Sequence, residues 1–265
     1  MYWVNGKPDS QIPLGDRGLH YGDGCFTTAR VHKGKIQLLE RHIQRLKQAT
    51  VLLLMAEIDW HQLENEIQQA AMQIDDGVLK VMLTRGSGGR GYSVNDVTCP
   101  TRIMASSPFP QHYSEWREQG IALVLCPLKL AKNAMLAGVK HLNRLEQVLI
   151  RAELDKCGAQ EGIVLDTDDR LIECCAANFF WRQGWHVFTP RLDHAGVNGI
   201  MRQHIMSVLA DSPYQLEEVS VPFEALALAD EVFICNALMP IIPVKQIEGW
   251  SYSSHQLYDY LSPFC

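Results

Sequence analysis

The chain has 265 residues, of which 47% are hydrophobic and 20% are charged, and its formal net charge is −6. This length suits one large domain or two modest ones, with a sizeable core. The acidic balance, without any run of Lys or Arg, excludes nucleic acid and anionic membranes as the main partners. A small molecule or another protein remains as the expected partner.

The first ten residues, MYWVNGKPDS, lack the basic start and apolar stretch of a signal peptide. No apolar run reaches the roughly 18 residues that a membrane helix needs. The eight cysteines are scattered and never form a C-x-x-C pair, so we expect reduced thiols, no metal site and a cytoplasmic protein. They are Cys25, Cys99, Cys126, Cys157, Cys174, Cys175, Cys235 and Cys265.

Hydrophobic periodicity predicts a mixed α/β unit in the first hundred residues. We expect strands at residues 2–4, 29–31, 78–85 and 101–106, and helices at 38–54 and 61–72. Residues 107–120, SPFPQHYSEWREQG, lose this periodicity and contain two prolines, which is typical of a linker. The predicted organisation is therefore a smaller N-terminal α/β domain over 1–106, an interdomain linker over 107–120 and a larger domain over 121–265.

The second half alternates helices and strands, without an internal repeat. A strand begins at Ile121, and a helix is expected just after Lys140. Further strands are predicted at 162–166, 172–181, 185–190, 231–236 and 241–247, with helices from about residue 199 and over 222–228. This alternation indicates an α/β fold for the larger domain as well.

The stretch GSGGRG, residues 86–91, formally matches the G-x-G-x-x-G pattern of a dinucleotide-binding turn. The following YSVNDVTCPTR is poor in helix formers, so no helix N-terminus is expected to meet a pyrophosphate, and we reject that site. Glycines flanked by Arg85 and Arg90 suit a backbone that approaches a carboxylate or phosphate. They suit an exposed flexible loop with solvated charges equally well, and the residues alone leave both interpretations open.

Lys140 stands before KHLNRLEQVLIRAEL, a segment with helical periodicity. Its apolar positions on one predicted face are Leu142, Leu145, Val148, Leu149 and Ala152. A cation at the positive end of a helix is disfavoured, so this amine should lose its proton more easily than at its free pKa of about 10.4. A neutral lysine can act as a nucleophile. The alternative is a surface lysine whose stem covers apolar neighbours, beside a packed or solvent-facing His141.

Two downstream features favour the first interpretation. Glu173 lies in a strand among apolar and small residues, where an ionised carboxylate needs a cationic or protonated partner such as a cofactor ring nitrogen. In GVNGIMRQHIM, residues 196–206, glycines precede an amphipathic helix, which leaves the N–H groups of Ile200 and Met201 for an anion. The alternative for the second feature is an ordinary turn before a helix.

Seven segments together resemble one known family over almost the whole chain and in the same order. They are DRGLHYGDGCFTTARV (16–31), HIQRL (42–46), TRGSGGRGYS (84–93), GVKHLNRLEQVLIRAEL (138–154), IECCAANFFW (172–181), AGVNGIMRQ (195–203) and DEVFICNALMPIIPV (230–244). The chain resembles the fold-type IV pyridoxal-phosphate (PLP) enzymes, which include the branched-chain and D-amino acid aminotransferases. Within them it is most similar to the lyases that act on 4-amino-4-deoxychorismate.

This resemblance implies a two-domain α/β fold like that of D-amino acid aminotransferase, with the active site in the cleft between the domains. It implies that Lys140 binds PLP covalently and that Glu173 faces the pyridine nitrogen. Arg45 and the N–H groups of Ile200 and Met201 are implied to bind the cofactor phosphate, together with the Asn236–Ala237 turn. Arg144 matches the position of a tyrosine that touches the cofactor in branched-chain enzymes, and Arg90 and Tyr92 match substrate-carboxylate positions of D-amino acid aminotransferases.

The resemblance is not uniform, because aminotransferases of this group often carry hydroxyl residues where this chain has Met201 and Asn236–Ala237. Backbone contacts survive that change and hydroxyl contacts do not. The implied reaction is a PLP-dependent carbon–oxygen lyase step that gives 4-aminobenzoate and pyruvate in folate biosynthesis, in a homodimer with composite sites. Alternatives are a D-amino acid or branched-chain aminotransferase and a binding protein that kept the fold and lost the chemistry.

Overall fold

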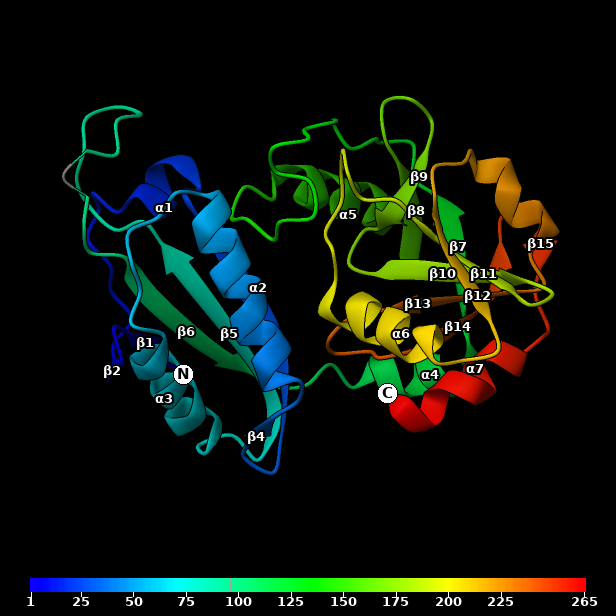
Figure 1. Cartoon of the computed structure of the whole chain (residues 1–265), viewed down its shortest axis with the longest axis horizontal. Coiled ribbons are helices and arrows are strands. Elements are labelled where there is room, and N and C mark those ends of the chain that lie inside the picture. Colours follow the sequence, from blue (N-terminus) through cyan, green and yellow to red (C-terminus); the bar gives the residue numbers. More distant parts are fainter. Residues whose placement is uncertain (96) are drawn as a thin grey trace. The chain divides into compact units, whose positions relative to one another are not determined.

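The computed structural model describes residues 1–95 and 97–265, and the chain divides into two compact units (Figure 1). Unit 1 contains Met1–Phe109 and Lys140–Asn143, and unit 2 contains Pro110–Val139 and Arg144–Cys265. Each unit combines a β-sheet with helices, so the predicted mixed α/β class is confirmed. The return of four residues, Lys140 among them, to unit 1 is a feature that the sequence did not indicate.

Among its described residues, unit 1 has a six-stranded antiparallel sheet in the order β2-β1-β6-β5-β3-β4. The strands are β1 (Tyr2–Val4), β2 (Lys7–Pro8), β3 (Gly24–His32), β4 (Lys35–Ile36), β5 (Asp76–Thr84) and β6 (Thr101–Ser107). The predicted strand at 29–31 is only the end of β3, whose earlier part carries threonines that weaken the apolar signal. Alternate β3 residues are buried, which fixes one face of the strand on the core.

Helices α2 (Leu39–Leu52) and α3 (Trp60–Ala71) cover the core of unit 1, close to the predicted ranges. They bury Ile43, Leu46, Leu63 and Ile67. Helix α3 begins after Asp59, whose side chain accepts a hydrogen bond from the Gln62 N–H at 2.9 Å, an N-cap that satisfies a first-turn donor. A shorter helix, α1 (Arg17–Tyr21), begins in the same way after Asp16.

Unit 2 holds a nine-stranded sheet among its described residues, in the order β12-β11-β10-β13-β14-β7-β8-β9, with β15 paired to β14. The strands are β7 (Ile121–Leu125), β8 (Glu161–Leu165), β9 (Leu171–Cys174), β10 (Asn178–Gln183), β11 (His186–Pro190), β12 (Gln215–Val219), β13 (Glu231–Cys235), β14 (Ile242–Ile247) and β15 (Trp250–Ser251). The single strand predicted at 172–181 is wrong. Cys174 donates its N–H to the Ala177 carbonyl at 2.7 Å, and this turn separates β9 from β10.

The core of unit 2 is built from the inward residues of this sheet. Phe179, Trp181 and Phe188 stack in series, with ring centroids 5.8 and 5.5 Å apart. The helices are α4 (His112–Gln119), α5 (Leu145–Lys156), α6 (Ile200–Ala210) and α7 (Gln256–Leu261), with short 3₁₀ turns η1 (Phe223–Leu228) and η2 (Ser262–Phe264). The segment predicted as a helix over 222–228 is thus a 3₁₀ turn.

Helix α4 occupies most of the segment that the sequence indicated as a linker. Tyr113 and Trp116 of α4 pack against the core of unit 2. Pro110 disrupted the apparent periodicity, although it lies just before the helix rather than inside it. Residues 110–120 are therefore described with unit 2.

Helix α5 differs from the prediction in its start and in the face that it buries. It begins at Leu145, five residues after Lys140, and buries Ile150 and Leu154. The residues predicted to form its buried face are exposed instead, with Leu145, Val148 and Leu149 at 70%, 60% and 54%. The apolar stripe that the periodicity indicated is therefore not the face that α5 packs on the core of unit 2.

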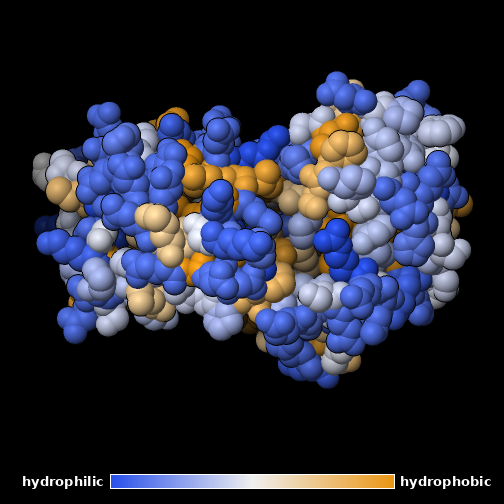
Figure 2. Space-filling view, turned by 90° about the horizontal axis from the view of Figure 1, so that it is seen from below, coloured by the Kyte–Doolittle hydropathy of each residue, from blue (hydrophilic) through white to orange (hydrophobic). Residues whose placement is uncertain are grey.

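The surface is mostly hydrophilic on the face drawn in Figure 2, with apolar side chains gathered in patches. Exposed large apolar residues in unit 1 include Val51, Leu54 and Met72, and isolated residues of this kind are normal on a protein surface. No helix among residues 1–95 and 97–265 is both long enough and apolar enough to cross a membrane.

Candidate active site

Lys140 lies in a short extended segment that pairs with the first residues of β3. The Phe26 N–H donates to the Lys140 carbonyl at 2.9 Å, and the Leu142 N–H donates to the Gly24 carbonyl at 2.9 Å. Asn143 extends the contact, because its side-chain amide donates to the Gly22 carbonyl at 3.1 Å. The segment is thus a strand-like addition to the sheet of unit 1. It is not the first turn of a helix, so the argument from the helix dipole is wrong, since that effect falls off within one turn.

The side chain of Lys140 is half-buried against the Phe26 ring, with Nζ 4.7 Å from the ring centroid. Lys80, from β5, places its own Nζ 4.6 Å from the centroid of the same ring. Burial lowers the pKa of Lys80 below its ordinary value. The sheet of unit 1 therefore places two lysine amines on one aromatic ring. This pair argues against the interpretation of Lys140 as an ordinary surface lysine.

Arg45 lies on α2, beneath the same end of β3. Burial raises the pKa of the Cys25 thiol to about 12, while the nearby Arg45 charge opposes that shift. Burial lowers the pKa of His42 to about 3, and the Arg45 charge adds to that effect. His42 Nδ1 is 2.6 Å from the Thr27 hydroxyl, which ties α2 to β3. Unit 1 therefore brings Arg45 to the β3 residues that adjoin Phe26 and Lys140.

Glu173 is buried on β9 of unit 2, at 5% exposure, as the sequence predicted. Its Oε2 accepts a hydrogen bond from the Val197 N–H at 2.8 Å. A Cβ on Gly196, where φ is +82°, would lie 2.7 Å from Ile172 and 3.4 Å from Glu173 Oε2, so only glycine fits there. The carboxylate is thus held in place by the backbone of the glycine segment that precedes α6.

Asn178, the first residue of β10, braces the same segment. Its side-chain amide donates to the Val197 carbonyl at 2.9 Å, and its Oδ1 accepts the Gly199 N–H at 3.1 Å. Gly199 is the N-cap of α6 and provides no side-chain hydrogen bond to the helix. The N–H groups of Ile200 and Met201 therefore begin a helix without a side-chain cap, which suits an anion.

Arg144 is the residue before α5, and its guanidinium donates to the Val139 carbonyl at 2.5 Å. Burial lowers the pKa of Arg144, whereas the charges of Glu173 and Glu146 raise it. Arg144 and Glu173 are consequently close enough to interact electrostatically. This cation next to a buried carboxylate lowers the cost of keeping Glu173 ionised.

The Asn236–Ala237 turn follows β13 and is ordered by the Asn236 side chain. Oδ1 accepts the N–H groups of Leu238 and Met239 at 2.8 and 2.9 Å. The side-chain amide donates to the Ala176 carbonyl at 3.0 Å, close to the turn that ends β9. Asn236 thus has a defined structural role, because its backbone N–H also donates to the Met239 carbonyl at 2.9 Å, and the turn positions Ala237.

The glycine stretch after β5 forms a loop in unit 1 in which Arg90 and Tyr92 are exposed, Tyr92 at 88%. The described residues after it, 92–95 and 97–100, contain no helix, which agrees with the rejection of a dinucleotide site. Arg85 does not face solvent with Arg90. It is buried, pairs with Asp23 at 2.7 Å and donates to the Leu53 and Leu54 carbonyls. Only one of the two flanking guanidiniums is therefore available to a ligand.

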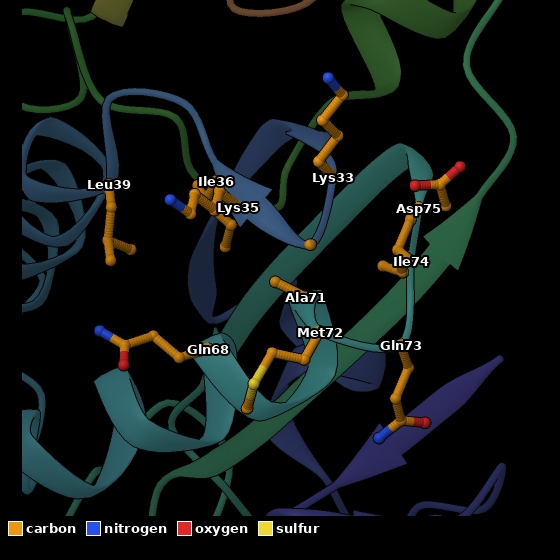
Figure 3. Close-up of a pocket in the computed structure, with 11 residues that line it drawn as sticks. Lys33, Lys35, Ile36, Leu39, Gln68, Ala71, Met72, Gln73, Ile74 and Asp75 are labelled. Carbon is orange, nitrogen blue, oxygen red and sulfur yellow. The ribbon is translucent and has the colours of Figure 1, made fainter.

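A pocket of about 850 Å³ lies elsewhere in unit 1, between the β3–β4 turn and the end of α3 (Figure 3). Figure 3 shows Lys33 and Lys35 at its rim and Ala71 and Met72 beneath them. It adjoins the far end of β3 from Phe26, and a nine-residue strand spans roughly 30 Å. None of the predicted site residues lines this pocket.

Comparison with known proteins identifies the family and the fold. Residues 24–247 match the amino-transferase class IV family. The aminodeoxychorismate lyase of Vibrio harveyi is 37% identical to the chain over 94% of the chain and 92% of that protein. The crystal structure of 4-amino-4-deoxychorismate lyase from Pseudomonas aeruginosa has a TM-score of 0.93 and 37% identity, and the match covers 99% of this chain and 98% of the other.

A second solved structure shows how far the fold extends beyond these relatives. The branched-chain amino acid aminotransferase of Escherichia coli has a TM-score of 0.87 at 23% identity, over 99% of this chain and 93% of that chain. The mixed α/β architecture is thus that of the fold-type IV enzymes. The chain belongs to the amino-transferase class IV family.

Sequence reasoning did not identify two residues that the structure places among the candidate site residues or their supports. They are Lys80 and Asn178. Lys80 could have been found as a lysine in the middle of the apolar strand VLKVMLT, where a charge needs a reason. Asn178 gave no comparable signal, because its partners lie nineteen and twenty-one residues away.

Proposed function

We propose that the chain is a PLP-dependent carbon–oxygen lyase that converts 4-amino-4-deoxychorismate to 4-aminobenzoate and pyruvate. The observation that carries this choice is the lysine pair on the Phe26 ring. The substrate has two carboxylates, and Lys80 supplies a half-buried cation next to the lysine that would react. The 37% identity to the Vibrio harveyi lyase along 94% of the chain supports the same choice.

The residues of unit 2 fit the chemical groups of PLP. A buried carboxylate, Glu173, suits a protonated ring nitrogen, and its geometry is fixed by the Val197 N–H. The uncapped first turn of α6 supplies N–H groups from Ile200 and Met201 for a phosphate. Gly196 lets the segment pass close to Ile172 and Leu192, since a Cβ there would lie 2.7 and 2.9 Å from these side chains.

We propose that Arg45, Arg144 and the Asn236–Ala237 turn also contact the cofactor, with Arg45 and the turn at the phosphate. Within unit 2, Gly138 exchanges hydrogen bonds with the glycine segment, donating to the Gly196 carbonyl at 2.9 Å and accepting from Asn198 at 3.0 Å.

When bound, PLP supplies an electron sink for negative charge on the carbon that carries the substrate amine. Lys140 would hold the cofactor through its amine and would remove the proton from C4 of the substrate. The ether bond on the neighbouring carbon then breaks, and Lys140 returns a proton as pyruvate forms. Glu173, held by the Val197 N–H, would face the ring nitrogen and favour its protonated form.

Substrate recognition is assigned to unit 1, which carries the half-buried Lys80 and the exposed Arg90. Lys80 and Arg90 would each bind a carboxylate, and Tyr92 would line the same loop. Arginine suits this role because its planar fork can make two parallel hydrogen bonds to a carboxylate. The site therefore separates cofactor binding, largely in unit 2, from recognition of the two acids.

The reaction is tested by giving 4-amino-4-deoxychorismate to the purified, PLP-loaded protein and measuring both products. We expect pyruvate and 4-aminobenzoate in equal amounts. Turnover of D-alanine or branched-chain amino acids with 2-oxoglutarate, without pyruvate release from the aminodeoxychorismate, would replace the lyase with an aminotransferase. Protein that cannot be loaded with PLP would support the non-catalytic interpretation.

We also propose that the protein is a homodimer, supported by the exposed apolar stripe of α5. Leu145, Val148 and Leu149 are more than half exposed, although they recur at helical spacing. Burial against the same patch of a second copy would remove this apolar surface from water. Sedimentation analysis should give twice the chain mass. Leu149→Glu should shift the equilibrium toward monomer. Ala152→Glu should shift it less, because the alanine that it replaces provides less apolar surface.

A cytoplasmic location and a place in folate synthesis complete the proposal. All eight cysteines are free thiols, four of them buried, which is typical of a reducing compartment. Cell fractionation should recover the lyase activity with the cytoplasmic proteins. Deletion of the gene should create a growth requirement that 4-aminobenzoate relieves.

A further inference from the structure

Arg17 is a buried arginine whose guanidinium reaches the end of the glycine loop. It is 4% exposed. Nη1 donates to the carbonyls of Gly91 and Ser93 at 3.0 and 3.2 Å, and Nη2 donates to the Tyr92 carbonyl at 3.5 Å. These three carbonyls directly follow Arg90, so one guanidinium fixes the backbone on which both predicted substrate-binding side chains are carried.

The backbone of the same helix holds the start of the loop. Arg17 donates its N–H to the Gly86 carbonyl at 2.9 Å. Asp16, at 0% exposure, caps α1 and accepts hydrogen bonds from the hydroxyls of Thr84 and Thr101 at 2.9 and 2.8 Å. The first turn of α1 is therefore a fixed base, and the loop is attached to it at both ends.

Arg17 already has a carboxylate partner, which separates it from the exposed Arg90. Its Nε donates to Asp23 Oδ2 at 2.9 Å, and Arg85 Nε donates to the same oxygen at 2.7 Å. Burial raises the pKa of Asp23, but the hydrogen bonds from Arg85 and Arg17 outweigh this effect, so the pKa lies below its ordinary value. Arg17 is thus a structural cation, and Arg90 is the exposed one.

Close packing leaves the loop little freedom around this guanidinium. A Cβ on Gly89, where φ is +72°, would lie 2.3 Å from the Ser93 carbonyl oxygen and 3.1 Å from Arg17 Nη1. The guanidinium also lies 4.8 Å from the Tyr21 ring centroid, and that ring lies 5.5 Å from the Tyr92 ring. Arg17 therefore contacts the loop in two ways. Its guanidinium donates to backbone carbonyls of the loop, and it lies on the Tyr21 ring, which packs against Tyr92.

We infer that Arg17 is a positioning residue for substrate binding, which fixes residues 90–93 so that Arg90 and Tyr92 are presented to a carboxylate of the substrate. This inference rests on the proposed function, because it takes the loop as the carboxylate-binding element. Arg17 itself does not touch the substrate. Its effect is a reduction of the loop's conformational freedom before binding.

The test compares Arg17→Lys with Arg85→Lys in the PLP-loaded enzyme. Both variants keep a cation at Asp23, but Arg85 donates to Leu53 and Leu54 rather than to the loop, so it is the matched control. Two quantities are measured: kcat and KM for pyruvate release, and the rate of tryptic cleavage after Arg90 relative to cleavage after Lys156. Cofactor loading is checked from the absorbance of each protein.

For Arg17→Lys we expect KM to rise about 10-fold with kcat within about 2-fold, because the lost hydrogen bonds act on substrate binding. Cleavage after Arg90 should rise about 5-fold or more. Arg85→Lys should change neither quantity, even if its melting temperature falls. Equal behaviour of the two variants would overturn the inference.

Two further outcomes are decisive. Faster cleavage after Arg90 with an unchanged KM would overturn the substrate role of the loop, while the lyase reaction itself would stand. If the wild type releases no pyruvate, the proposed function has failed, and the cleavage assay still reports whether Arg17 holds the loop.

If Arg17→Lys does not fold, Tyr21→Leu is the substitute variant, because Tyr21 is partly exposed. It should raise both KM and the rate of cleavage after Arg90 by about 3-fold.

Discussion

The Lys140 region of unit 1 and the Glu173 region of unit 2 hold the predicted site residues in different ways. Lys140 is held by its backbone, through hydrogen bonds to β3, while its amine rests on an aromatic ring. Glu173 is held by its side chain, whose carboxylate accepts a backbone N–H inside a segment braced by Asn178. The first arrangement fixes the backbone of the residue, and the second fixes the side chain itself.

This difference matches the tasks proposed for the two regions. A group that must bind the cofactor, leave it and then transfer protons needs a mobile end on a fixed backbone. A carboxylate that keeps one ring nitrogen protonated needs a fixed position and a buried, fully hydrogen-bonded environment. Substitutions in the two regions should therefore affect different kinetic quantities.

The largest effect is expected from Lys140→Ala. This substitution removes the side-chain amine and leaves the backbone hydrogen bonds of residue 140 intact. Pyruvate release should fall by roughly 10⁴-fold or more, because no other described side chain is assigned to the proton transfers. The melting temperature should change little. Retention of the wild-type rate would remove Lys140 from the mechanism.

A smaller effect is expected from Glu173→Gln, which keeps an acceptor for the Val197 N–H but removes the charge. We expect kcat to fall about 100-fold with little change in KM, as well as slower exchange of the C4 proton with solvent deuterium. Glu161→Gln is the control. Glu161 is another buried carboxylate of unit 2, which accepts N–H groups from Gly162, Cys175 and Ala176, and its loss should affect stability rather than kcat.

Lys80→Met tests whether the two lysines on the Phe26 ring, Lys80 and Lys140, have different roles. If Lys80 binds a substrate carboxylate, KM should rise about 10-fold while kcat changes by less than about 3-fold. Steady-state kinetics of pyruvate release would measure both. A fall in kcat with an unchanged KM would instead show that Lys80 acts on Lys140 and not on the substrate.

The smallest effect is the dependence of stability on pH that His42 of α2 causes next to β3. Because burial lowers the pKa of His42 to about 3, the folded protein does not bind a proton there until far below the ordinary value of 6.5. Below pH 6.5 the unfolded chain binds this proton and the folded protein does not, so stability falls as pH decreases toward 3. Well above pH 6.5 His42 is neutral in both states, so it does not change how stability depends on pH.

Linkage gives the expected size of this loss as about 2 kcal/mol between pH 7 and pH 5. The measurement is the free energy of unfolding in urea at the two pH values, for the wild type and for His42→Gln. The variant should lose about 2 kcal/mol less than the wild type over this interval. Parallel losses in both proteins would show that other groups set the acid sensitivity of unit 1.

Much of the fold was accessible from sequence, because local patterns determine long elements. The periodic segments at 38–54 and 61–72 became α2 and α3, and the apolar runs became β5, β8, β13 and β14. Helix α4 was missed because proline and polar residues obscured a short amphipathic turn. The exposed face of α5 was misassigned, since periodicity shows that a face is apolar but not what covers it.

The sequence by itself determined the α/β class, the candidate residues Lys140 and Glu173, and the family they resemble. These depend on local composition and on the order of motifs along one chain. Tertiary structure decided that Lys140 pairs with β3, that Lys80 shares its aromatic ring, and that Arg17 holds a loop more than seventy residues away. Such contacts join residues far apart in the chain, and their partners become neighbours only when the sheet has formed.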